Sequence, residues 1–214
     1  MTATCYPMNQ MRGAQRENPQ DLDIGPRDME VLRFIGEEAL LGFTFEGLKR
    51  RLGAHSETLS RILDRLEEQR ILEKTGQGYQ VTERGREVTS LRQLAASEPR
   101  LTLLRTLLPH VDNPRDAISN LRGRWFGPLR WLGYSEDEKG TIMKWITEDG
   151  SIQVDAIFSR GELTIEGRIK EGKDLTDAIK ASHQLMGYIS KVYPSSPSER
   201  VAYCAIGGPF QLSN

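Results

Sequence analysis

The chain has 214 residues, of which 37% are hydrophobic and 28% are charged, proportions typical of a globular protein with one large domain or two smaller ones. Its formal net charge of −1 excludes a uniformly basic nucleic-acid-binding protein. Any DNA-binding surface must therefore be a local basic patch.

The first 25 residues are expected to form a disordered leader, because helical periodicity begins only near Pro26. This segment lacks the apolar core of a signal peptide. No apolar run in the sequence approaches the roughly 18 residues of a membrane span. These features indicate a cytoplasmic protein.

Residues 26–97 show the pattern of several short helices and one hairpin. The stretch PRDMEVLRFIGEEALLG has apolar residues at helical spacing. Thr44 is expected to cap a short helix that ends at Gly53. Ser56 is expected to cap the next helix, SETLSRILDRLEE, which has an apolar stripe made of Leu59, Ile62, Leu63 and Leu66.

A β-hairpin is predicted directly after this helix, with strands at 71–74 and 79–81. Gly76 and Gly78 lie at its tip, where a positive φ is often needed. Thr82 is expected to cap a further helix that has Val88, Leu91 and Leu94 on one face. This order of elements predicts a winged helix-turn-helix.

Residues 43–85 also resemble the DNA-binding domain of MarR/ArsR-type winged-helix regulators, particularly the archaeal members. The resemblance is carried by ETLSRILDRLEE, by the apolar pair Ile71-Leu72 and by GYQVTERG. One departure is Arg70, where many relatives have a Gly that ends the recognition helix. The resemblance implies that the helix after Ser56 enters the major groove of DNA and that the hairpin contacts the adjacent backbone or minor groove.

The candidate DNA-binding residues follow from this arrangement. Arg61 is the best candidate for reading a base, because a guanidinium matches the two acceptors of guanine. Phosphate contacts are expected from the end of the second helix and the turn after it. The full set is Lys49, Arg50, Arg51, His55, Ser56, Thr58, Ser60, Arg61 and Arg65, with Lys74, Gln77 and Tyr79 from the hairpin.

Between Lys49 and Arg65 five basic residues outnumber the two acids, Glu57 and Asp64. The function predicted is therefore a sequence-specific transcriptional regulator that binds double-stranded DNA. Two alternatives remain open: a weakly specific, chromatin-like DNA-binding protein, and a winged-helix module that binds other proteins of the transcription machinery.

Residues 98–113 are expected to form a helical connector after Pro99. This segment is rich in leucine, with Leu101, Leu103, Leu104, Leu107 and Leu108. Such a helix packs on its own chain or forms a two-fold interface. A homodimer is expected, because two recognition helices then reach successive major grooves.

Residues 114–214 are expected to form an α+β domain for dimerisation or effector sensing. A short helix is predicted at 114–123, and strands are predicted at 129–134, 141–147, 151–158, 162–169 and 200–207. Alternation predicts one buried face and one solvated face, which carries Gln153, Asp155, Thr164, Glu166 and Arg168. A helix capped by Asp174 is expected to cover the buried face. The fold class predicted for the whole chain is thus α+β.

No catalytic motif or cofactor fingerprint is found in the sequence. The two cysteines, Cys5 and Cys204, predict no disulfide framework, and the three histidines are too scattered for a metal site. His183 is expected at the surface of the last helix. The three tryptophans (Trp125, Trp131 and Trp145) either pack in the core or line a pocket for an effector. We expect no enzyme activity and no cofactor.

Overall fold

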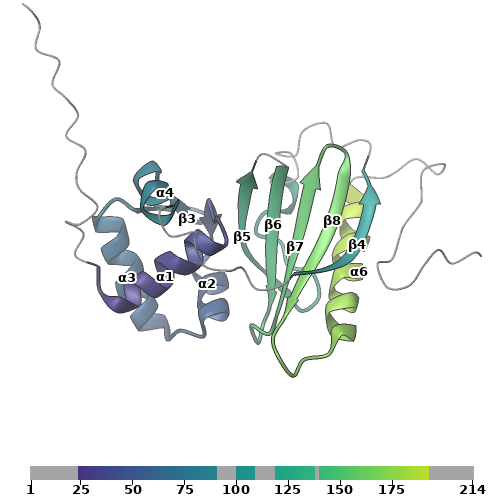
Figure 1. The fold of residues 1–214 in the computed structure, drawn as a ribbon, viewed down its shortest axis with the longest axis horizontal. Helices are drawn as coiled ribbons and strands as arrows, with labels where there is room; N and C mark the ends of the chain where they lie inside the picture. The colour runs from purple at the N-terminus through teal and green to yellow at the C-terminus, as the bar shows by residue number, and fades with distance from the viewer. Residues whose placement is uncertain (1–23, 91–99, 109–118, 138–139, 193–214) are drawn as a thin grey trace, which may run out of the picture.

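The structure is a computed structural model that describes residues 24–90, 100–108, 119–137 and 140–192 (Figure 1). It is a mixed fold of helices around one eight-stranded antiparallel sheet, in agreement with the predicted α+β class. The strand order is β2-β3-β1-β5-β6-β7-β8-β4. No helix in these ranges is both long and apolar enough to cross a membrane.

Residues 24–90, here called the N-terminal unit, have the predicted order of helices and a hairpin. The elements are α1 (Pro26–Glu37), β1 (Gly42–Phe43), α2 (Phe45–Leu52), α3 (Ser56–Glu68), β2 (Leu72–Thr75), β3 (Gly78–Val81) and α4 (Glu83–Ser90). Thr44 caps α2 by accepting a hydrogen bond from the Gly47 amide at 3.2 Å, and Gly53 ends α2 with a φ of 63°. Thr82 accepts from the Gly85 amide in the same way.

Two details at the ends of α3 depart from the sequence pattern. The N-cap is His55, and Ser56 is already the first helical residue, so the predicted serine cap is wrong by one position. At the other end Arg70 has a φ of 57°. Arg70 thus takes the left-handed conformation that glycine adopts most readily, at a cost of roughly 1–2 kcal/mol. The chain turns after α3 without the glycine.

Residues 100–192, here called the C-terminal unit, form most of the sheet. The elements are β4 (Leu101–Leu107), β5 (Leu129–Asp137), β6 (Gly140–Thr147), β7 (Ile152–Ser159), β8 (Glu162–Ile169) and α6 (Leu175–Val192). Helix α6 lies across one face of the sheet (Figure 1) and buries Ala178, Ala181, Leu185 and Ile189 against it. Asp174 caps α6 through the Thr176 amide at 2.9 Å, as predicted.

The leucine-rich helix predicted before this sheet is wrong. Residues 101–107 form strand β4, which pairs with β8 at one edge of the sheet. A bulge between Thr102 and Leu104 lets the adjacent Leu103 and Leu104 both become buried. Pairing with a strand about 60 positions later in the chain therefore overrides the helical preference of leucine.

Several predicted features lie partly or wholly outside the described residues. They are the leader before residue 24, the helix beyond Ser90, the first part of the helix at 114–123 and the strand at 200–207. The tryptophans are described. Trp131 and Trp145 pack edge to face in the core below α6, whereas Trp125 is 64% exposed. The core interpretation therefore holds for Trp131 and Trp145.

The two-residue strand β1 joins the two units into one sheet. Gly42 and Phe43 pair with β3 on one side and with β5 on the other. Helix α2 then packs on β5 so closely that a Cβ on Gly47 would lie 2.6 Å from the Cα of Leu132. Leu132 and Ile146 consequently belong to the core of the N-terminal unit, on the sheet face opposite α6.

The sheet face expected to be solvated is instead partly buried. Glu38, directly after α1, reaches β6 and β8, where its carboxylate accepts a hydrogen bond from Arg168 and lies 3.0 Å from Lys144 Nζ. Asp155 lies 3.3 Å from the same Lys144 nitrogen, and Arg100 approaches both acids. Glu38 and Lys144 side chains are each 1% exposed. This set is called the buried ion cluster below.

The close packing at Gly47 predicts a large effect from one methyl group. Gly47→Ala should lower the free energy of unfolding by about 1–3 kcal/mol, because the new Cβ meets backbone atoms of β5 that cannot easily move. Urea denaturation measures this change. Gly187→Ala in α6, where the new Cβ meets nothing within 4 Å, is the control and should stabilise the protein by about 0.5–1 kcal/mol. An unchanged stability of Gly47→Ala would contradict the close contact of α2 with the sheet.

The buried ion cluster predicts a dependence of stability on Glu38 and on pH. Burial raises the pKa of Glu38, but Lys144 and Arg168 outweigh it and lower the pKa to about 2. The stabilisation from this carboxylate should be fully present above its ordinary pKa of 4.5 and be lost as the pH falls toward 2. Glu38→Gln should cost about 3–5 kcal/mol at pH 7, because it leaves Asp155 as the one acid of the cluster to compensate the buried cations.

The neighbouring residue provides a matched control. Glu37→Gln removes the same charge from a partly exposed side chain 3.7 Å from Arg33, and should change stability by less than about 1 kcal/mol. Thermal unfolding of both variants between pH 3 and pH 7 measures the difference. Equal losses of stability in the two variants would show that the buried ion cluster stabilises the protein no more than the exposed pair of Glu37 and Arg33 does.

Candidate nucleic-acid interface

Helix α3 lies at the end of the molecule that is remote from α6 (Figure 1). Its apolar stripe (Leu59, Ile62, Leu63 and Leu66) is buried, as predicted from the spacing. His55, Ser56 and Arg61 are exposed on the outer side, and Thr58 and Ser60 are partly exposed. The C-terminal half of the same outer side presents Asp64 and Glu68. The outer side of α3 is therefore polar throughout but not basic throughout.

Arg61 is the most exposed cation of α3, with 71% of its side chain accessible. Its guanidinium donates to Glu57 Oε1 at 2.6 Å, one helical turn earlier. Because Glu57 is 79% exposed, this pair is screened by water and contributes little to stability. Arg61 can thus exchange Glu57 for another acceptor at small cost.

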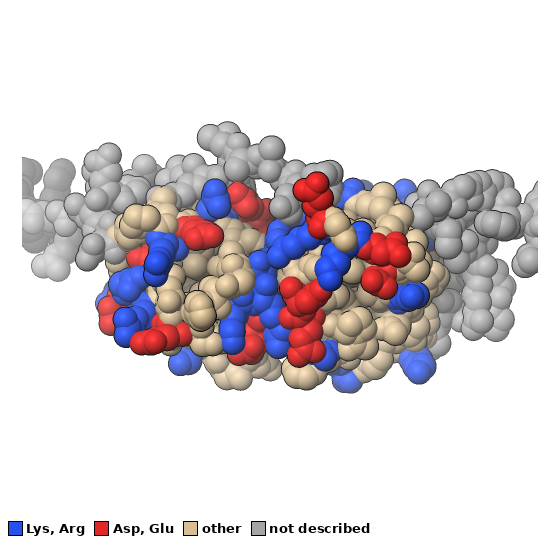
Figure 2. All heavy atoms as spheres, turned by 90° about the horizontal axis from the view of Figure 1, so that it is seen from below, with Lys and Arg blue, Asp and Glu red and all other residues tan. Residues whose placement is uncertain are grey.

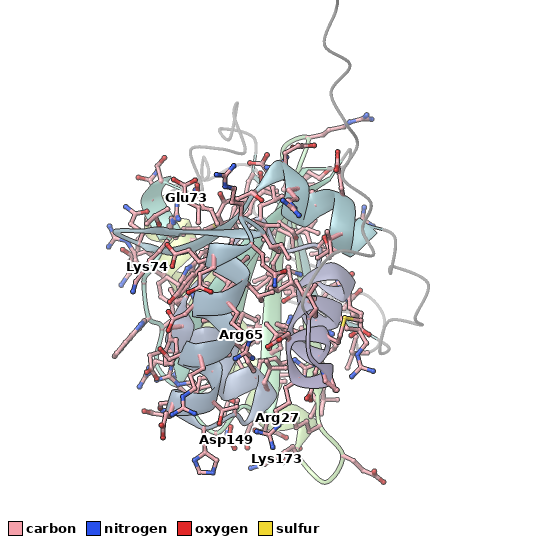
Figure 3. All side chains as sticks on the ribbon, turned by 90° about the vertical axis from the view of Figure 1, so that its left-hand side faces the viewer. Arg27, Arg65, Glu73, Lys74, Asp149 and Lys173 are labelled. Atoms are coloured by element: carbon pink, nitrogen blue, oxygen red, sulfur yellow. The ribbon has the colours of Figure 1, made fainter. Side chains whose placement is uncertain are left out.

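Arg65 has a different role from the one predicted. Its guanidinium donates through Nε and Nη2 to both carboxylate oxygens of Asp28, which is buried in the first turn of α1. Asp28 also accepts from the Gly25 amide at 2.9 Å. Figure 3 shows Arg65 between α3 and α1. Arg65 therefore joins two helices, and its guanidinium is less available to DNA than that of Arg61.

Arg50 and Arg51 lie at the junction of the two units. The backbone of Arg50 packs against the turn at Gly150 between β6 and β7, and its side chain is only 17% exposed, 3.6 Å from Glu46. The guanidinium of Arg51 lies over the ring of Phe34 and beside β7 and β8. Lys49, the third basic residue expected to hold phosphates here, is partly exposed.

The hairpin divides its predicted contacts between the surface and the core. Lys74 and Gln77 are exposed, and Figure 3 shows Lys74 and Glu73 on the same projecting hairpin. Tyr79 is only 6% exposed and stacks on Phe43 at 5.7 Å, which leaves little of its side chain for the predicted DNA contact. The alternation of β3 turns Tyr79 inward, where burial raises the pKa of its hydroxyl.

The charge of this surface is mixed. Over the N-terminal unit, basic and acidic side chains alternate on the face seen in Figure 2. Helix α3 itself holds Arg61 and Arg65 but also Glu57, Asp64, Glu67 and Glu68. The basic excess counted along the sequence therefore does not gather on α3, because Arg50 and Arg51 face the sheet.

Sequence reasoning missed two groups that shape this region. Asp28 was not recognised as the partner of Arg65, although an acid in the first turn after Gly25-Pro26 is a common helix-start signal. The junction residues on β7 and β8 were assigned to a solvated face. Of these two groups, only Asp28 had a local signal in the sequence.

No family model, no curated protein and no solved structure matches this chain. The resemblance to winged-helix regulators thus remains a prediction from the residues. In the ranges that the structure describes, no group of three or more His, Cys, Asp or Glu side chains is placed to hold a metal ion.

The contrast between Arg65 and Arg61 is testable without DNA. Arg65→Ala should lower the free energy of unfolding by about 1–3 kcal/mol, because Asp28 is left buried without its charged donor. Arg61→Ala should cost less than about 0.5 kcal/mol, since its partner is exposed. Chemical denaturation of both variants measures this. Similar losses for both would argue against the structural role of Arg65.

Proposed function

We propose that the chain is a sequence-specific DNA-binding transcriptional regulator whose N-terminal unit is a winged helix. The observation that carries the proposal is an exposed helix, α3, that follows a short helix and precedes an exposed hairpin, with Arg61 on its outer side. In this proposal the protein acts by binding and catalyses no reaction.

The N-terminal half of α3 is the part that suits DNA. His55, Ser56, Thr58 and Ser60 offer hydrogen-bonding groups there, and Arg61 can reach a guanine edge when it leaves Glu57. In this proposal Lys49, Lys74 and Gln77, which are partly or fully exposed, contact the phosphate backbone on either side. Asp64 and Glu68 lie toward the other end of α3, so the proposal requires that end to point away from the phosphates.

Selection of genomic DNA fragments on the purified protein tests this function. Wild-type protein should enrich a defined motif, and Arg61→Ala should lower its affinity for that motif by about 1–3 kcal/mol while leaving non-specific binding nearly unchanged. Lys180→Ala is the control, because Lys180 is an exposed cation on α6. Absence of binding at low salt by correctly folded protein would contradict the proposal.

A homodimer is part of the proposal, because two α3 helices would reach major grooves about 34 Å apart. A two-fold symmetric motif in the selected fragments would support it. Binding without any motif would instead favour the weakly specific, chromatin-like role.

A second function, binding to another protein, is favoured by one observation. Every basic residue on α3 has an acidic partner, and further acids follow on its outer side. Glu57→Gln separates the two functions. It removes a negative charge beside Arg61, so DNA affinity should rise if this side faces phosphates. A protein partner that binds the Arg61–Glu57 pair would instead be weakened.

A further inference from the structure

A cavity of about 270 Å³ lies where α2 meets the sheet. Arg51 lines it from the N-terminal unit. Ser151, Gln153, Arg168, Lys170 and Glu171 line it from the C-terminal unit. This volume is at the small end of ligand pockets and suits a molecule of roughly ten heavy atoms or fewer.

The cavity has a surplus of positive charge. Three of its residues, Arg51, Arg168 and Lys170, are cationic, and Glu171 is its only acid. The buried ion cluster behind it does not cancel this surplus, because it holds two acids and three cations. Glu38 and Asp155 are the acids, and Arg168, Lys144 and Arg100 are the cations. A concave site with one sign of charge and buried walls concentrates the electrostatic potential and attracts an anion.

Two further acids, in the turn before Ser151, are held by other cations. Asp149, in the turn before Ser151, accepts from Lys173 at 2.9 Å and from the hydroxyls of Thr147 and Ser151, and these contacts lower its pKa. Glu148 lies 3.1 Å from Arg130. Figure 2 shows basic side chains gathered in a strip along the middle of the face, next to acidic ones. Asp149 and Glu148 therefore do not neutralise the cations of the cavity.

The side chain of Gln153 indicates a second property of the ligand, a hydrogen-bond donor. Its side chain is 3% exposed, and its Nε2 donates to Glu38 at 3.2 Å and to Asp155 at 2.9 Å. Its Oε1 is buried and accepts no hydrogen bond from the described residues. A buried acceptor of this kind is stabilised by a donor. A ligand with a hydroxyl group beside its anionic groups supplies one.

We propose that this cavity binds a small hydroxylated anion, with carboxylate or phosphate groups held by Arg51, Arg168 and Lys170 and a hydroxyl directed to Gln153. Arg51 belongs to α2 and the other groups to β7, β8 and the residue after it, so the ligand would contact both units. The binding site itself does not depend on the proposed DNA binding, and its test uses no DNA.

Thermal unfolding of the full chain with defined probes tests the site. L-Malate and glycerol 3-phosphate, each at 10 mM and at constant ionic strength set with sodium chloride, should raise the Tm. Succinate, which equals malate without its hydroxyl, should raise it less. A shift with malate alone identifies a carboxylate ligand, and a shift with glycerol 3-phosphate alone identifies a phosphate ligand. No shift beyond the salt control with either probe overturns the proposal.

Substitutions of lining residues test whether the probes raise the Tm by binding in the cavity. Lys170→Gln, which changes an exposed side chain, should reduce the affinity for the effective probe at least fivefold, and Arg51→Gln should abolish the shift. Lys180→Gln on α6 should leave it unchanged. A malate shift that survives Lys170→Gln and Arg51→Gln, or that succinate reproduces in full, would show that the anion binds elsewhere or without the hydroxyl contact.

Discussion

The structure depends on the pairing of one two-residue strand. Gly42 and Phe43 hydrogen-bond to β3 on one side and to β5 on the other, and this pairing converts a small hairpin and a larger meander into a single sheet. Backbone hydrogen bonds fix both the distance and the direction of neighbouring strands. The position of α3 relative to the C-terminal unit is thereby set by main-chain geometry.

Two further contacts reinforce this arrangement on the sheet face opposite α6. Gly47 allows α2 to approach the β5 backbone, and Glu38 places a carboxylate among the cations of β6 and β8. One contact is apolar and steric, and the other is electrostatic. The junction of the two units is therefore a packed interior, and a ligand in the cavity beside it would contact elements that already pack against one another.

The sequence predicted what depends on near neighbours in the chain. The caps at Thr44, Thr82 and Asp174 are made with residues two or three positions away, and the apolar stripe of α3 follows from helical spacing. The missed features depend on distant partners. Arg65 binds a residue 37 positions earlier and Arg168 one 130 positions earlier, and β4 becomes a strand because β8 accepts it. No local pattern specifies such pairs, so the sequence did not show that Arg65 and Tyr79 also have partners within the fold.

The shared sheet also has a consequence for how the chain folds during synthesis. Leu132 and Ile146 complete the core around α1, α2 and α3, yet they are translated after the whole N-terminal unit. Until β5 emerges, β1 has an open edge and the inner side of α2 faces water. Pairing across about 90 residues is slow, because a long loop must close first. The N-terminal unit thus leaves the ribosome with an unpaired strand that its own chain covers only later, and this interval is when chaperones or wrong partners can bind it.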